Sequence, residues 1–399
     1  MSAQPGIPSD ESLEAFRQRT RAWLEANCPP EMRQPVVDDA DVCWGGRRFR
    51  FKNDAQRAWL ERMAQRGWTV PEWPKQYGGG GLSKEEGRVL REEMAQLRCR
   101  PPLTSFGISM LGPALLKYGN GAQKKEHIPK IVHGEIRWCQ GYSEPGAGSD
   151  LASLKTRADD AGDHYLVNGS KIWTSYGDKA DWIFCLVRTD VSGKKQEGIS
   201  FLLFDMESPG VTTRPIRLIS GYSPFTQTFF DNVKVSKDNL LGELNHGWTI
   251  AKYLLTHERN MIGGMGLGAS PQSLGQLAVK AIGLSSGRLA ESALRTDIAR
   301  YEMDAQAFAL TMARVAAEAK AGNETGAMSS MLKYYGTELN KRRAELAMSI
   351  GGTDSLKFGD DHSDVAPMWL RTRGNSIEGG TSEVQLNIIA KNVLRLPGN

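Results

Sequence analysis

The sequence predicts an α+β protein of several domains, in which a β domain lies between two helical ones. Apolar residues recur at helical spacing up to about residue 135, alternate with a period of two over about 138–240, and return to helical spacing from Gly247 onward. With 399 residues, the chain is long enough for two or three domains of ordinary size. We expect the domains to comprise residues 1–136, 137–243 and 244–399.

The N-terminal domain is predicted to be mostly helical. Residues 10–27 place apolar side chains on one face, and residues 55–66 form a second helix that ends at Gly67. A capping box at residues 83–86 starts another helix. The glycines just before it, at residues 78–81, lack the Gly-Lys-Ser/Thr of a phosphate loop, so we interpret them as a turn.

The middle domain is predicted to be a β-barrel or a sandwich. Its candidate strands are rich in Val, Ile, Phe and Thr and are separated by Gly, Asp and Asn turns. They comprise residues 164–167, 170–176, 181–189, 199–206, 211–219 and 227–235. Asn168-Gly169, between the first two, is a strong hairpin signal, so we expect the chain to reverse direction there.

The C-terminal domain is predicted to be a helical bundle. Long Ala- and Met-rich segments run at about 247–282, 290–321 and 325–350. The glycines at 263–268 look like a dinucleotide fingerprint, but they follow a helical stretch rather than a strand, so we prefer a role in close helix packing. A capping box at residues 382–385 leaves the last helix with a free N-terminus that could receive an anionic group.

The stretch from 138 to 176 is the centre of the functional prediction. A strand-like run meets a polar bend at residues 144–148, where Pro145 fixes φ and the glycines permit close backbone approach. Further on, Trp173 and Ser175 lie two residues apart and therefore on one face of a strand. These features together indicate a site for a planar ligand that forms hydrogen bonds.

Composition and charge exclude several classes of protein. The net charge of +4 is small for this length and does not argue for nucleic-acid binding. No apolar run reaches the roughly 18 residues of a membrane span, and the N-terminus lacks the pattern of a signal peptide. Five scattered cysteines without a CxxC pair argue against a zinc site or a disulfide framework and suit a reducing cytoplasmic compartment.

Four segments resemble the acyl-CoA dehydrogenase family, and in the family's order. They are GWTVPEWPKQYGG (67–79), SEPGAGSDLASLKTRA (143–158), FFDNVKVSKDNLLGELNHGW (229–248) and IEGGTSEVQLNIIAKNVL (377–394). The resemblance covers nearly the whole chain and implies an N-terminal helical domain, a middle β domain and a C-terminal four-helix bundle. It also implies FAD as the cofactor and an acyl-CoA thioester as the substrate.

The resemblance implies which residues bind the ligands. Trp173 in isolation would be interpreted as a core residue, but within the matched segments we expect it to lie against the flavin together with Ser175. Ser149 is also expected to contact the substrate, as is Arg259. The expected cofactor-binding residues are Gln140, Tyr142, Ser143, Gly148, Ser149, Trp173, Thr174, Ser175, Gly351, Gly352, Thr381 and Glu383.

The family reaction needs a carboxylate that removes the α proton of the thioester. Many members place this Glu directly before Gly-Thr-Ser, but Gly379 occupies that position here, and Glu378 lies one residue earlier. A second group of members carries its base on the first long bundle helix, before an Arg, and Glu258 matches that pattern. We favour Glu258 over Glu378 as the base; the alternative role for Glu258 is a surface ion pair.

Two departures from the family pattern concern the adenine side of FAD and the assembly. The family's Arg-x-x-Phe-Gly segment has no clean counterpart in residues 288–308, and Met348 replaces the usual Gln before Gly351-Gly352. Three functions stay open: a dehydrogenase that passes electrons to an electron-transfer flavoprotein, a flavin oxidase or monooxygenase, and a non-catalytic subunit of a heteromeric enzyme. We favour the first, in a homotetramer or a heteromeric tetramer.

Overall fold

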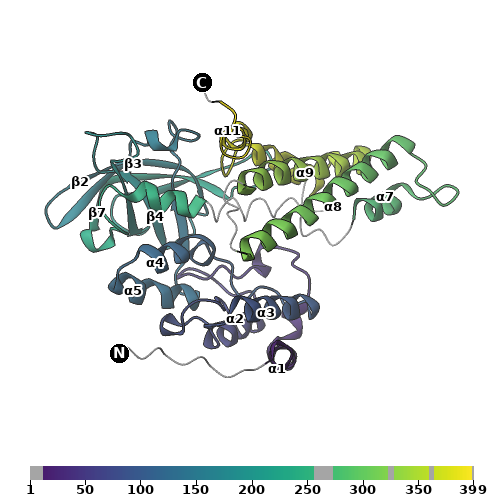
Figure 1. Cartoon of the computed structure of the whole chain (residues 1–399), viewed down its shortest axis with the longest axis horizontal. Coiled ribbons are helices and arrows are strands. Elements are labelled where there is room, and N and C mark those ends of the chain that lie inside the picture. The colour runs from purple at the N-terminus through teal and green to yellow at the C-terminus, as the bar shows by residue number, and fades with distance from the viewer. Residues whose placement is uncertain (1–11, 256–272, 322–327, 359–363, 398–399) are drawn as a thin grey trace.

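The computed structural model describes residues 12–255, 273–321, 328–358 and 364–397. Within them, a helical N-terminal part, a β-sheet and a helical C-terminal part follow one another, so the predicted fold class is confirmed (Figure 1). None of the helices among these residues is both long and apolar enough to cross a membrane.

The helices of the N-terminal part begin at polar caps, except α4 (Gly112–Tyr118), whose N-cap is Leu111. They are α1 (Leu13–Asn27), α2 (Asp54–Gln65), α3 (Lys84–Gln96), α4 and α5 (Gly121–Val132). The capping box predicted for α3 is present: the Ser83 hydroxyl accepts a hydrogen bond from the Glu86 N–H, and the Glu86 carboxylate accepts one from the Ser83 N–H. Gly67, with a φ of +67°, follows the end of α2 as predicted.

Between residues 138 and 236, all of which are described, seven strands form one sheet. They are β1 (Trp138–Gly141), β2 (Arg157–Asp160), β3 (His164–Ser175), β4 (Trp182–Arg188), β5 (Ile199–Asp205), β6 (Val211–Ile216) and β7 (Phe225–Ser236). The strand order is β1-β4-β2-β3-β7-β6, with β5 paired to β4. β1 runs parallel to β4, and the long strands β3 and β7 pair in antiparallel orientation.

The hairpin predicted at Asn168-Gly169 is wrong, because β3 runs through both residues. The register of β3 and β7 shifts there instead, next to Asn232, whose φ of +49° marks an irregularity in β7. The Asn168 side-chain oxygen accepts a hydrogen bond from the Asn232 N–H at 2.8 Å. Close packing explains the glycine, since a Cβ atom on Gly169 would lie 2.7 Å from the Thr156 Cα atom.

One hydrophobic core contains residues of the sheet, of helices that precede the sheet in the sequence, and of a helix that follows it. Phe184 of β4 and Phe201 of β5 stack with their ring centroids 6.1 Å apart. The same core includes Leu115 of α4, Ile131 of α5 and Leu254, which is also helical. Figure 1 shows α4 and α5 beneath the sheet. This shared core fixes the sheet against the N-terminal helices.

The C-terminal part forms a second core. Its helices are α7 (Leu274–Ile282), α8 (Ser292–Lys320), α9 (Met328–Gly351), α10 (Val365–Thr372) and α11 (Ser382–Asn392). Leu332, Leu339 and Leu346 follow one another at seven-residue intervals on α9, and all three are buried in this core.

The capping box predicted at the start of α11 is wrong by one residue. Thr381, not Ser382, is the N-cap, and its hydroxyl accepts a hydrogen bond from the Val384 N–H at 3.2 Å. The Gln385 amide turns back to donate to the carbonyl oxygens of Gly379 and Gly380. The helix therefore begins immediately after the double-glycine turn.

Candidate functional site

The two predicted halves of the site lie side by side in the structure. The Ile172 N–H of β3 donates to the Ser143 carbonyl oxygen at 2.8 Å, and the Lys171 ammonium donates to the Tyr142 carbonyl oxygen at 3.1 Å. Residues that are about 29 positions apart in the sequence thus meet at the start of the bend. The bend is placed next to the segment that carries Trp173.

A buried ion pair between Lys171 and Glu144 holds the bend against β3. The Lys171 side chain is fully buried, and its Nζ atom lies 2.8 Å from a carboxylate oxygen of Glu144. The same carboxylate accepts hydrogen bonds from the backbone N–H groups of Lys155 and Thr156. Burial opposes ionisation of Glu144, but the charge of Lys171 and these hydrogen bonds outweigh it, so its pKa is lowered. Sequence analysis missed this pair, although Lys171 occupies an inward position of a strand.

The bend itself is open to one side. A Cβ atom added to Gly146 or Gly148 would meet nothing within 4 Å among the described residues beyond its chain neighbours, so packing against them does not explain either glycine. Ser149 is exposed, and Ser143 is half-buried. The Tyr142 ring is buried against Phe184 and Phe201, so the part of Tyr142 that faces the bend is its backbone.

The strand beside the bend presents Trp173 outward. Its φ is +61°, in a region that few residues other than glycine adopt, and its side chain is 52% exposed. The register of β3 and β7 shifts between Lys171 and Thr174, and this bulge turns Trp173 to the surface. Thr174 is fully buried, and its carbonyl oxygen accepts a hydrogen bond from the Thr226 hydroxyl, whereas Ser175 is half-buried.

Trp173 connects the sheet to the C-terminal part. Its ring meets the Phe225 ring edge to face, with centroids 6.0 Å apart. The guanidinium carbon of Arg371, at the end of α10, lies 5.4 Å from the centroid of the same Phe225 ring. The structure thus brings the last residues of α10, just before the turn that follows it, to Phe225 of β7 and so close to Trp173.

Glu378, one of the two candidate bases, is held in that turn. Its carboxylate accepts hydrogen bonds from Arg371 at 2.7 and 3.3 Å and from the Asn375 amide at 2.5 Å. The buried Lys333 of α9 donates hydrogen bonds to the carbonyl oxygens of Asn375 and Gly380, at the two ends of this turn. The two-pronged arginine pair restrains the direction of the Glu378 carboxylate.

The remaining predicted residues lie at helix ends or outside the described residues. Thr381 and Glu383 begin α11, and hydrogen bonds from its own backbone N–H and from Thr381 lower the pKa of Glu383. Gly351 ends α9, and Gly352 follows it with a φ of +54°. Glu258, Arg259 and the predicted glycine run at 263–268 lie outside the described residues.

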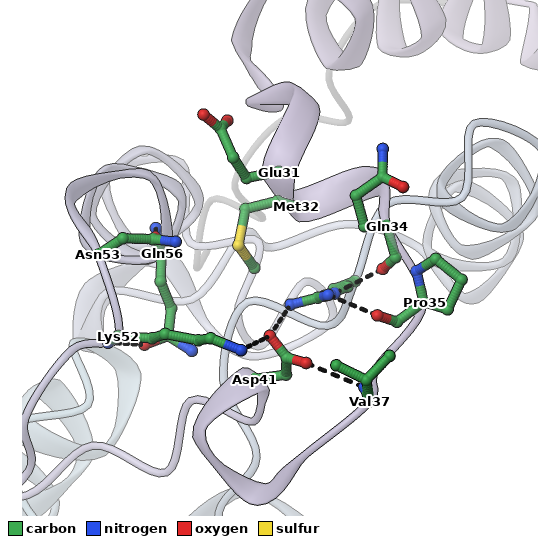
Figure 2. Close-up of a pocket in the computed structure, with 10 residues that line it drawn as sticks. Glu31, Met32, Gln34, Pro35, Val37, Asp41, Lys52, Asn53 and Gln56 are labelled. Carbon is green, nitrogen blue, oxygen red and sulfur yellow. Dashed lines mark hydrogen bonds and ion pairs between the residues drawn. The ribbon is translucent and has the colours of Figure 1, made fainter.

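The N-terminal part contains a separate cavity of about 350 Å³ (Figure 2). Its Arg100 side chain donates to Asp41 and to the carbonyl oxygens of Gln34 and Pro35, and Lys52 also pairs with Asp41. Because these charged groups satisfy one another, we assign the network a structural role.

Comparisons with known proteins identify each of the three domains. Family models match the acyl-CoA dehydrogenase N-terminal domain at residues 10–135, the middle domain at 139–233 and the C-terminal domain at 245–394. The acyl-CoA dehydrogenase IpdE1 of Mycobacterium tuberculosis is 34% identical over 397 residues, which cover 97% of this chain and 98% of IpdE1.

Solved structures give the same result. The structure named Tcur3481-Tcur3483 steroid ACAD has a TM-score of 0.78 at 30% identity, over 97% of this chain and 98% of the matched one. A chain of the ChsE4-ChsE5 complex from Mycobacterium tuberculosis has a TM-score of 0.73 at 28% identity, over 99% and 100%. With all three domains matched in order, this chain is a member of the acyl-CoA dehydrogenase family of oxidoreductases.

Proposed function

We propose that this chain desaturates the α,β bond of an acyl-CoA thioester with FAD and passes the electrons to an electron-transfer flavoprotein. The observation that carries this proposal is the open bend at residues 144–148, which the buried Lys171–Glu144 pair holds beside the exposed ring of Trp173. An open, glycine-containing backbone next to an aromatic ring fits a flat cofactor. Membership of the acyl-CoA dehydrogenase family supports FAD as that cofactor.

The residues that would hold FAD come from three parts of the chain. Backbone groups of the bend and the hydroxyls of Ser143, Ser149 and Ser175 would form hydrogen bonds to it, and Trp173 would lie against its ring system. The start of α11 at Thr381 offers N–H groups to an anionic or polar part of the cofactor. When bound, FAD supplies the hydride acceptor that no side chain provides.

For the base we propose Glu258, with Arg259 and Ser149 in contact with the substrate. The ion pair of Glu378 with Arg371 supports this choice, because a base must be free to approach the α carbon's proton. In this proposal Glu378 acts as a structural residue that shapes the turn before Thr381.

The purified protein should be yellow, and the chromophore released by heat should have the mass of FAD. Under anaerobic conditions, a saturated acyl-CoA that fits the site should bleach the flavin, whereas its α,β-unsaturated counterpart should not, because it has no hydride to give. Turnover with an artificial acceptor but not with oxygen would distinguish the dehydrogenase from an oxidase. A colourless protein that cannot be reconstituted with FAD would contradict the proposal.

We also propose that the chain works as a tetramer, either homomeric or with a second homologous chain. Large apolar side chains are exposed on its C-terminal part, and buried interfaces are the usual reason for such patches. They include Met303, Leu310, Leu356, Phe358, Met368 and Ile377. The paired names Tcur3481-Tcur3483 and ChsE4-ChsE5 support the heteromeric version.

Light scattering should therefore give a mass several times that of the 44.0 kDa chain. For the heteromeric version, the chain alone should associate poorly and should gain FAD and activity on co-expression with a homologous partner. A stable, active monomer would rule out both versions.

A further inference from the structure

A second cavity lies between the N-terminal part and the sheet, apart from the bend. Its volume is about 390 Å³, within the range of pockets that hold small organic ligands. The N-terminal part contributes Trp44, Arg48 and Arg50, and the middle part contributes Arg137 and Tyr176.

Arg137 is the unusual residue of this cavity. It is 7% exposed, and its guanidinium carbon lies 4.6 Å from the centroid of the Trp44 ring and 5.0 Å from that of Tyr176. No hydrogen bond or ion pair joins its side chain to any residue that the structure describes. The Arg100 guanidinium, by contrast, has three protein acceptors.

The guanidinium of this largely buried arginine has no acceptor among the described residues, and its nitrogens keep their small exposure where the residue lines the cavity. It carries five N–H donors, and buried polar groups are almost always hydrogen-bonded. The two aromatic rings attract the positive charge but accept no conventional hydrogen bond from it. Burial lowers the pKa of Arg137, because the loss of hydration outweighs the opposing effect of nearby acidic groups.

The charges around the cavity favour an anion. Cationic side chains lining it outnumber acidic ones, since Arg48, Arg50, Arg137 and Lys179 face Asp39 and Asp178. Neither acid lies within ion-pair distance of Arg137. An oxyanion could therefore take the acceptor position that no group of the described residues occupies.

We propose that this cavity binds the carboxylate or phosphate group of a small organic anion, with Arg137 as its two-pronged donor. The walls formed by Trp44 and Tyr176 would contact a flat apolar body attached to that group. This inference is independent of the proposed dehydrogenation, because it rests on residues outside the bend.

Calorimetric titration with benzoate, phenyl phosphate and benzamide tests the proposal. The first two differ only in the anion, and benzamide keeps the ring without the charge. We expect one or both anions to bind and benzamide not to bind. Arg137→Met should weaken anion binding by roughly tenfold or more, because a charge-assisted pair of hydrogen bonds is lost.

Arg66→Met is the matched control, because Arg66 also lies over two rings, Trp23 and Trp68, but lines neither cavity. It should leave anion binding unchanged. If Arg137→Met does not fold, Arg137→Lys keeps the charge while removing the fork and should still weaken binding. Absence of binding by both anions, or equal binding to wild type and the Arg137 variant, would overturn the proposal.

Discussion

Replacing Lys171 with Met is expected to lower the free energy of unfolding by about 3–5 kcal/mol, the usual effect of breaking a buried ion pair. The substitution fills much of the same volume but leaves the Glu144 carboxylate buried without its cation. The bend should then move away from β3, because the Lys171 bond to the Tyr142 carbonyl oxygen is lost as well. Urea denaturation would measure the stability, and fluorescence of released flavin would measure retention of the cofactor.

Lys195→Met, in the loop between β4 and β5, is the matched control. Lys195 pairs with Asp150 at 2.7 Å, but both side chains are about half exposed, so its loss should leave stability almost unchanged. The double variant Glu144→Gln with Lys171→Met should recover part of the loss, because no buried charge is left unpaired. Equal, small effects of Lys171→Met and Lys195→Met would show that the buried pair does not hold the bend.

Glu258→Gln is expected to reduce the rate of flavin reduction by acyl-CoA by ~10²–10⁴, the usual contribution of a positioned general base. The amide keeps the size of the side chain but cannot take the proton, so binding of FAD and acyl-CoA should persist. Stopped-flow absorbance at the flavin band measures the reduction, and equilibrium titration measures the binding.

Glu378→Gln should reduce the rate of flavin reduction less than Glu258→Gln does, and through a change in the protein's structure rather than loss of the base. Its carboxylate is held by Arg371 and Asn375, so the variant should loosen the turn before Thr381. Arg371→Gln, which removes the other half of the ion pair, should then reproduce its phenotype. Near-normal reduction in Glu258→Gln with collapse in Glu378→Gln alone would instead make Glu378 the base.

Much of the fold could be predicted because it depends on local signals. The change from helical spacing to a period of two, and back at Gly247, follows from the residues themselves. The capping box at Ser83 is equally local, since it involves side-chain and backbone groups three residues apart. The open bend before Ser149 also follows from its own Pro and Gly residues.

The local signals failed where distant contacts compete with them. Asn168-Gly169 resembles a hairpin turn, but the approach of Thr156 to Gly169 and the bond between Asn168 and Asn232 keep β3 extended. At α11, the double-glycine turn accepts the Gln385 amide, so the cap moves to Thr381.

The sequence by itself therefore determined the order of the domains and the segments that resemble the acyl-CoA dehydrogenases. Only the tertiary structure decided which charges meet: Lys171 with Glu144, Arg371 with Glu378, and Arg137 with two rings and no carboxylate. Secondary structure depends on neighbours within a few residues, whereas an ion pair depends on the path of the chain between its partners. For Lys171 and Glu144 that path spans 27 residues and two strands, which no periodicity encodes.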